Sequence, residues 1–157
     1  MSIRFYLSKD PYYELTNHSA HGFNLDSYFW PTVEHYYQAQ KFVGSEYAEA
    51  IRNAPNPMAA RRMGRDKEYP IRLDWDEVKE AVMYRATLAK FESHPDALAS
   101  LLSTGDEELV EASPRDLYWG GGADGSGLNR YGQILMQVRG LLRSRTEGAS
   151  KEIGGLG

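Results

Sequence analysis

The sequence predicts a single, mainly helical domain with a few short strands. Its 157 residues fit one core, because single domains commonly take about 100–200 residues. Helix-start signals recur through the central part of the chain, whereas segments rich in β-formers are short and few. No internal repeat or inter-domain linker interrupts the sequence. We therefore expect residues 1–145 to form the domain and residues 146–157, TEGASKEIGGLG, to form a flexible tail.

The first expected elements are extended segments. Residues 3–7, IRFYL, are rich in β-formers, and the SKDP that follows ends this predicted strand. Turn-favouring residues mark 8–22 as a loop, and a short extended piece is expected over 23–29.

The first helix is expected to begin after Thr32. Pro31 disfavours a helical conformation at Trp30, and the Thr32 side chain can cap the free amides of the next turn. The helix sequence, PTVEHYYQAQKF, mixes charged and amide side chains with aromatic ones.

Two further helices have start signals of their own. Asn56 can act as a cap with Pro57 at the first helical position, and Gly64 marks the end. Asp74 and Glu77 have the spacing of a capping box and precede a long run of core-type positions. The central part of the chain is therefore expected to be mainly helical.

The C-terminal third combines both kinds of element. A short helix is predicted over 96–102 and a strand over 108–112. The loop SPRDLYWGGGADGSGLN then leads into RYGQILMQVRGLLRSR, whose apolar residues form a helical stripe.

Composition excludes several classes of function. The chain has 18 Lys and Arg against 22 Asp and Glu, with the signs interspersed, so no basic stripe predicts a duplex-binding surface, although a local phosphate pocket remains compatible. It has no cysteine, which excludes a thiol nucleophile and a thiolate metal site. No secretion-like segment or apolar run of about 20 residues is present, so we expect no membrane span and a cytoplasmic location.

The first candidate site is the helix after Thr32. Glu34, Gln38 and Lys41 follow at i, i+4 and i+7 and share one face. A solvated face explains this spacing, but the aromatic residues on the other sides favour burial. In a cleft, desolvation lowers a lysine pKa by up to about 3–5 units, and a neutral amine is a nucleophile whose protons a carboxylate can move. His35 points away from this face and is expected to be a packed or surface histidine.

The second candidate is the glycine-rich stretch YWGGGADGSGLNRYG. Its glycines allow close backbone approach, Asn129 can cap the helix behind them, and free amides at that helix start favour a phosphate. Trp119 offers a stacking surface for a base. The stretch matches neither the dinucleotide fingerprint nor the Walker pattern, so a flexible connection remains the alternative.

The third candidate is a set of carboxylates flanking this loop, Glu111, Asp116 and Asp124. Such groups can protonate a leaving nitrogen or stabilise an oxocarbenium-like carbon, although each alone is also typical of turns and surfaces. The histidines lack zinc-site spacing and no Asp-rich calcium loop is present, so we predict no metal.

With these stretches in view, the sequence resembles the NADAR family and, within it, the YbiA-like N-glycosidases. The matching stretches are WPTVEHYYQAQKF, AARRMGRD, RLDWDEVKEAVMYRATLAKF and LLSTGDEELVEASPRDLYWGGGADGSGLNRYGQILMQVR, between residues 5 and about 143. The resemblance implies a compact α+β domain that hydrolyses N-glycosidic bonds to ribose 5-phosphate or ADP-ribose without a cofactor. The substrates it implies are early riboflavin-pathway intermediates or, as an alternative, ADP-ribosylated guanine in nucleotides or nucleic acid.

This resemblance suggests a mechanism for the first candidate site. Lys41 would attack C1 of the opened sugar and form a Schiff base, Glu34 would move protons, and Asp116 or Glu111 would be a second acid. A simpler route keeps Lys41 as an electrostatic group while a carboxylate activates water. The residues expected to bind substrate are Asn17, Trp30, Gln38, Arg65, Trp119, Gly120, Asp124, Gly125 and Asn129. A non-catalytic module that binds ADP-ribose or related metabolites remains a third reading, and the sequence does not give the oligomeric state.

Overall fold

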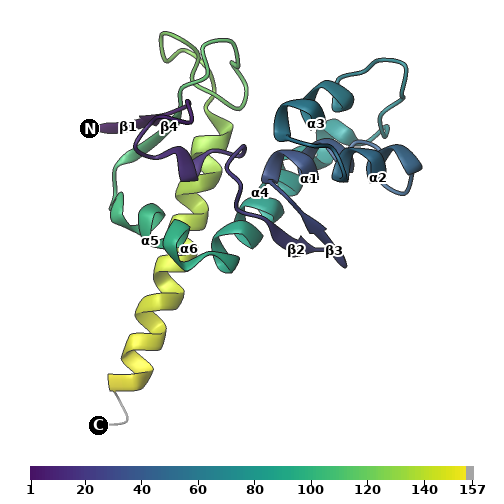
Figure 1. Ribbon diagram of the computed structural model, residues 1–157. Helices are drawn as coiled ribbons and strands as arrows, with labels where there is room; N and C mark the ends of the chain where they lie inside the picture. Colours follow the sequence, from purple (N-terminus) through teal and green to yellow (C-terminus); the bar gives the residue numbers. More distant parts are fainter. Residues whose placement is uncertain (155–157) are drawn as a thin grey trace. The chain divides into compact units, whose positions relative to one another are not determined.

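A computed structural model describes residues 1–154, with side chains through residue 149, and confirms the predicted mainly helical α+β fold. Figure 1 shows helices as the dominant elements and two short strand pairs. The elements are β1 (Ser2–Phe5), a 3-10 turn (Tyr13–Leu15), β2 (Phe23–Leu25), β3 (Tyr28–Trp30), α1 (Val33–Gln40), α2 (Glu46–Arg52), α3 (Pro57–Gly64), α4 (Trp75–Ser93), α5 (Pro95–Ser103), β4 (Glu108–Glu111) and α6 (Arg130–Gly154).

The chain forms two compact units, Thr16–Ala97 and a second made of Met1–Leu15 with Leu98–Gly157. The single domain expected over 1–145 stays a prediction.

Helix α1 is the centre of the unit Thr16–Ala97 and packs against α2, α3 and α4. Thr32 caps it as predicted, because its hydroxyl accepts a hydrogen bond from the His35 amide at 3.1 Å. Every residue from 33 to 39 is buried, including the charged and amide side chains. The predicted mixture of polar and aromatic groups therefore lies inside the unit.

Two features of the other helices differ from expectation. Helix α2 was not predicted, although the Ser45 hydroxyl caps it by accepting from the Ala48 amide at 3.2 Å. The capping box predicted for α4 is wrong, because Asp74 makes no side-chain bond to the helix amides. Its carboxylate accepts instead from the Arg72 guanidinium at 2.6 Å. By contrast, the Asn56 cap of α3 is confirmed, with Ala59 N donating to Asn56 Oδ1 at 2.8 Å.

Strands β2 and β3 form a short antiparallel hairpin in the same unit. Asp26 and Ser27 occupy its turn with φ of 54° and 70°, the left-handed pair that suits a tight hairpin. Tyr36 on α1 donates a hydrogen bond to Asp26 at 2.7 Å, and Arg85 on α4 donates to the same carboxylate at 2.7 Å. The hairpin turn is thereby tied to both helices.

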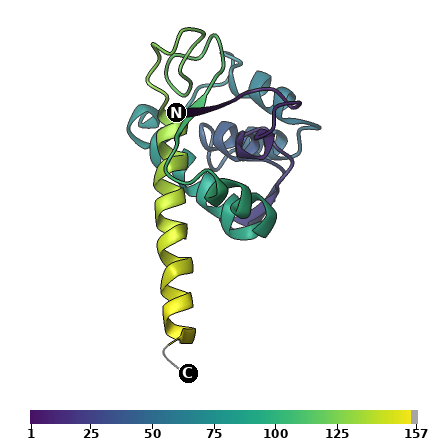
Figure 2. The same ribbon diagram turned by 90° about the vertical axis from the view of Figure 1, so that its left-hand side faces the viewer.

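The second unit is built on a parallel pair, β1 with β4, in which Ser2 aligns with Glu108. Helix α6 packs on β4 so closely that a side chain at Gly132 would collide with the Leu109 carbonyl. Figure 2 shows α6 as one continuous helix.

Helix α6 extends further than expected, through Gly154, so residues 146–154 are helical rather than irregular. Residues 155–157 of the predicted tail lie outside the described residues, and the flexibility of the segment stays a prediction. Within residues 1–154, no helix is both long enough and apolar enough to cross a membrane.

Candidate active site

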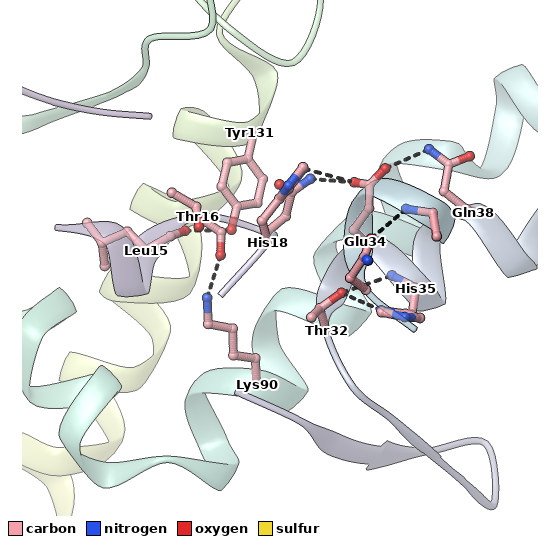
Figure 3. Close-up of polar contacts among 12 residues, drawn as sticks. Leu15, Thr16, His18, Thr32, Glu34, His35, Gln38, Lys90 and Tyr131 are labelled. Carbon is pink, nitrogen blue, oxygen red and sulfur yellow. Dashed lines mark hydrogen bonds and ion pairs between the residues drawn. The ribbon is translucent and has the colours of Figure 1, made fainter. Parts of the chain in front are cut away.

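The Glu34 carboxylate is held by two amide side chains inside the unit Thr16–Ala97 (Figure 3). It is 4% exposed. Its Oε1 accepts from Gln38 Nε2 at 2.7 Å, and its Oε2 accepts from Asn17 Nδ2 at 2.9 Å. The Glu34 amide also donates to the Asn17 carbonyl at 3.0 Å. A buried carboxylate needs such donors, and these fix its orientation.

His18 brings a second titratable group to Glu34, with Nε2 lying 3.9 Å from Glu34 Oε2. Burial lowers the pKa of His18; the Glu34 charge opposes this shift, and the Arg61 charge adds to it. The lowered pKa favours a neutral imidazole beside the carboxylate near neutral pH. Sequence reasoning treated His18 as a turn residue, because no spacing signal links it to α1.

Lys90 on α4 anchors the segment that carries these groups. Its side chain is fully buried, and its ammonium donates to the Thr16 carbonyl at 2.7 Å (Figure 3). A buried ammonium is costly unless it is hydrogen-bonded, so this contact is a strong constraint on the backbone next to Asn17 and His18.

Lys41, just after α1, is half-buried among aromatic rings. Its ammonium donates to the Gly64 carbonyl at 3.3 Å and lies 5.6 Å from the Tyr37 ring centroid and 6.0 Å from that of Trp75. These rings replace water around the nitrogen, which disfavours the charged form.

The pKa of Lys41 is lowered to about 8. Burial is the main cause; the Glu34 charge opposes it, and the charges of Arg65 and Arg61 lower it further. At pH 7 about one tenth of the amines would be neutral, far more than for an exposed lysine. Lys41 is therefore partly desolvated and feels the Glu34 charge, while its catalytic role stays a prediction.

Gln38 lies between this lysine and Glu34 along α1 and is 3% exposed. Its Oε1 is buried without a hydrogen-bond partner in the described chain. A side chain at Gly64 on α3 would collide with this oxygen, so Gly64 allows α3 to approach α1 closely.

Two neighbouring residues have mainly packing roles. The His35 ring contacts Thr32 Oγ1 at 2.8 Å through Nδ1 and the Ala54 carbonyl at 3.0 Å through Nε2, so it is a packed histidine, as expected. Trp30 is 5% exposed, and its indole N–H donates to the Leu25 carbonyl at 2.9 Å. Its assignment to substrate binding stays a prediction, because little of the ring is free to contact a ligand.

In the second unit, Asp116 organises the glycine-rich loop. Its Oδ1 accepts from the amides of Tyr118, Trp119 and Gly120 at 3.0, 2.8 and 3.4 Å. Glu111 lies against the same loop, since a side chain at Gly120 would collide with its carboxylate. The structure thus brings the predicted residues Glu111, Asp116 and Gly120 together.

Asn129 does not cap α6 as predicted. Its Oδ1 accepts from the Glu111 amide at 3.0 Å, and its Nδ2 donates to the Leu109 carbonyl at 2.9 Å. The side chain therefore fastens the loop to β4, and its φ of 52° reflects the sharp turn there.

The expected phosphate site at the start of α6 is also corrected. The Arg130 and Tyr131 amides donate to the carbonyls of Tyr118 and Trp119, each at 3.0 Å. Amides that are already paired cannot hold an anion without breaking these bonds.

The other predicted residues of this loop are more exposed than Gly120. Trp119 is half-buried, with its ring 4.9 Å from that of Tyr118. Asp124 and Gly125 are exposed; Asp124 Oδ1 accepts from the Ser126 amide at 3.0 Å, and Gly125 has a φ of 80°. Their substrate-binding roles stay predictions.

Comparison with known proteins finds the same architecture elsewhere. "N-glycosidase YbiA" from Escherichia coli is 47% identical over 137 residues, which cover 87% of this chain and 86% of that protein. "N-glycosidase Npun_R5314" from Nostoc punctiforme is 48% identical, with 92% and 94% covered. "Riboflavin biosynthesis protein PYRR, chloroplastic" from Zea mays is 44% identical over 97% of this chain but only 27% of its own length.

The fold agrees with these sequence matches. The NMR structure of E. coli YbiA superposes with a TM-score of 0.85 at 45% identity, covering 93% of this chain and 89% of that one. Residues 4–143 match the NADAR domain family, a span that includes all the predicted site residues. On sequence and fold together, the chain belongs to the NADAR family.

Proposed function

We propose that this protein is an N-glycosidase that hydrolyses the bond between a base-type exocyclic amine and ribose 5-phosphate in early intermediates of riboflavin biosynthesis. Two similar proteins are named N-glycosidases, and a third is named a riboflavin biosynthesis protein. The observation that carries the proposal is the combination of buried Glu34 with Lys41, whose pKa is about 8. A proton-transfer group and a partly neutral amine are the two functions that this reaction needs.

The proposed reaction passes through a Schiff base on Lys41. When an exocyclic amine is attached to the anomeric carbon, the sugar ring can open and C1 becomes an imine. The neutral Lys41 amine then adds to C1 of the opened sugar. The base gains a proton and leaves as a free amine, while C1 stays bonded to Nζ as an imine. Water then adds to C1, the C1–Nζ bond breaks, and ribose 5-phosphate and the lysine amine are released.

Glu34 donates and accepts the protons in this scheme, and His18 assists the transfer. The carboxylate is fixed by Asn17 and Gln38, and the imidazole lies 3.9 Å from it. A neutral imidazole next to a carboxylate can pass a proton on without leaving a buried charge. A second acid, Glu111 or Asp116, stays part of the proposal on the strength of the sequence.

A non-covalent route uses the same residues differently. Lys41 would stay protonated and stabilise charge while a carboxylate activates water. Treatment with borohydride during turnover distinguishes the two, because it reduces an imine to a stable amine. A sugar adduct on Lys41 supports the covalent route, and active enzyme that never traps an adduct supports the other.

The first test is a chromatographic assay of ribose 5-phosphate release from ribosylamino-pyrimidine intermediates. ADP-ribosylated guanosine is run in parallel, and Glu34→Gln serves as the inactive control. Release from the pyrimidines that disappears in the variant is the expected result. Release only from the guanine compound would instead indicate reversal of ADP-ribosylation, and tight ADP-ribose binding without any release would indicate a binding module.

The proposal implies a small-molecule substrate handled in the cytoplasm. Its steps use only side chains of this chain and water, so it invokes no cofactor.

A further inference from the structure

Arg61 on helix α3 and Arg65, the residue that caps its C-terminal end, carry guanidinium groups whose charges are not neutralised by carboxylates. Arg61 and Arg65 are four residues apart, so both project from one side of the helix. Within the described side chains, neither guanidinium forms a hydrogen bond or an ion pair. The carboxylate next in sequence, Asp66, accepts instead from the Glu68 amide at 3.0 Å.

The packing of α3 on α1 fixes the direction of this pair. Gly64 faces Gln38, because a side chain there would collide with the Gln38 amide oxygen. Around the helix, Arg61 and Arg65 are roughly 60° and 100° from Gly64, whereas Arg62 is roughly 160° away, on the opposite side. The pair therefore lies to one side of the contact with α1, and Arg62 points away from that contact.

Electrostatic effects agree with this placement. The Arg61 charge lowers the pKa of both His18 and Lys41, and the Arg65 charge lowers that of Lys41. Arg62 contributes to neither shift. Arg61 and Arg65 are thus close to the candidate active site.

This grouping of charge is unfavourable in the ligand-free protein. The charges of Arg65, Arg61 and Lys79 all act on Lys41, against the one carboxylate of Glu34, although the chain as a whole has a net charge of −4. Like charges four residues apart destabilise a helix. A dianion bound between the guanidinium groups would remove this repulsion, and the planar fork of arginine matches phosphate oxygens in two-bond geometry.

We propose that Arg61 and Arg65 form the site that binds the terminal phosphomonoester of the substrate. The inference rests on the proposed function and deepens it by naming the residues that hold the free phosphate end of the sugar. A phosphomonoester concentrates about two negative charges on one group near neutral pH, whereas each phosphate of a diphosphate diester such as ADP-ribose carries one. Two adjacent arginines therefore favour the monoester.

Inorganic phosphate is the probe that tests the site without turnover. The full-length protein is titrated with phosphate, and binding is followed by calorimetry and by NMR of the Lys41 side chain. We expect R61Q/R65Q to weaken phosphate binding by at least about tenfold. R62Q is the matched control and should bind like the wild type. Equal binding by wild type and R61Q/R65Q, or an equal loss in R62Q, would overturn the proposal.

The Lys41 titration gives a second readout. In the wild type, bound phosphate should raise the pKa of Lys41, because the anion offsets the two arginine charges that lower it. In R61Q/R65Q the pKa should already be higher without phosphate and should respond little to it. A wild-type pKa of Lys41 that does not move when phosphate is bound would place the anion elsewhere.

Turnover assays then separate this inference from the proposed function. If phosphate binding depends on the arginines but no ribose 5-phosphate is released, the phosphate site is supported and the N-glycosidase assignment is contradicted. Turnover with an unchanged KM in R61Q/R65Q would support the N-glycosidase activity and contradict the phosphate site at the two arginines.

Discussion

Asn17 donates a hydrogen bond to the Glu34 carboxylate at 2.9 Å, although 17 positions separate the two residues in sequence. The Asn17 carbonyl also accepts from the Glu34 amide, so the loop and the first turn of α1 are joined twice. The carboxylate most suited to proton transfer is thus held by a loop that has no regular secondary structure at that point. This arrangement makes the function of Glu34 depend on the conformation of residues 16–18.

Replacing Asn17 by Ala should therefore impair catalysis and stability together. The variant leaves one buried carboxylate oxygen without its donor, which typically costs about 1–3 kcal/mol. We expect a lower kcat and a lower urea midpoint. Asn53→Ala is the control, because Asn53 also donates to a glutamate, Glu49, but at an exposed position. If the kcat of Asn17→Ala matched that of the control, the link between the loop and Glu34 would have no catalytic role.

Lys41 should show opposite effects on activity and stability. Its pKa is about 8 in the folded protein against 10.5 for a fully hydrated lysine, so the unfolded chain binds more protons between these values. Stability should therefore rise with pH from about 8 to 10.5, and below pH 8 the buried charge destabilises the fold. Lys41→Met should abolish turnover, yet raise the free energy of unfolding at neutral pH and flatten this pH dependence. Urea titrations across that pH range measure it, and a Lys41→Met protein that is inactive but less stable than wild type at neutral pH would contradict the desolvation argument.

The same pKa predicts the pH profile of the reaction. If the neutral amine is the nucleophile, kcat should rise with pH through about 8 and then level off. An electrostatic Lys41 would give the reverse, a decline through the same range, because deprotonation removes its charge. The shape of the profile is therefore an independent check on the covalent route.

The sequence predicted the polar face of α1 but not the residues that complete it. Spacing within one helix placed Glu34, Gln38 and Lys41 on one face, and the aromatic residues around them correctly indicated burial of Glu34 and Gln38, whereas Lys41 is half-buried. His18 and Lys90 were missed because they reach the site through tertiary contacts, which local patterns do not encode. Nothing in a helix repeat indicates that one lysine of α4 will bond a loop carbonyl.

The errors at helix ends have the same origin. Asp74 has the sequence of a cap, but Arg72 competes for its carboxylate. The sequence predicted amides at the start of α6 that are available to a phosphate, but two of them donate hydrogen bonds to the loop carbonyls of Tyr118 and Trp119. In both cases a partner outside the helix occupies the group that the local pattern leaves open.

Lys90 should behave as a positioning residue and not only as a core residue. Lys90→Met keeps the apolar stem and removes the ammonium that holds the Thr16 carbonyl. We expect kcat to fall and the pKa of His18 to rise, because the Lys90 charge now lowers it. Thr87→Val is the control, since Thr87 is also fully buried on α4 but, among the described side chains, bonds only within its own helix, at Met83. NMR titration of His18 decides the matter: an unchanged pKa in folded Lys90→Met would limit Lys90 to a structural role.

A second check uses the coupling between Lys90 and Asn17. If Lys90 acts by holding the loop, its effect on kcat should largely disappear once Asn17→Ala has already released Glu34. The double variant would then lose less activity than the sum of the single losses, measured as free energies. Additive losses would mean that the two residues act separately.

Replacing Gly64 by alanine should destabilise the protein, although glycine-to-alanine changes within helices usually stabilise. Elsewhere in a helix this change stabilises by roughly 0.5–1 kcal/mol, and Gly140 in α6, with open space around its Cα, should follow that rule. At Gly64 the new methyl group would meet the Gln38 amide, so α3 must move away from α1 or Gln38 must turn. Either response disturbs the Gln38 bond to Glu34 and the Lys41 bond to the Gly64 carbonyl. We therefore expect Gly64→Ala to lower both the thermal midpoint and kcat/KM while Gly140→Ala raises the midpoint and leaves activity intact. A stabilised, fully active Gly64→Ala protein would show that the close approach of α3 to α1 is not what orders the site.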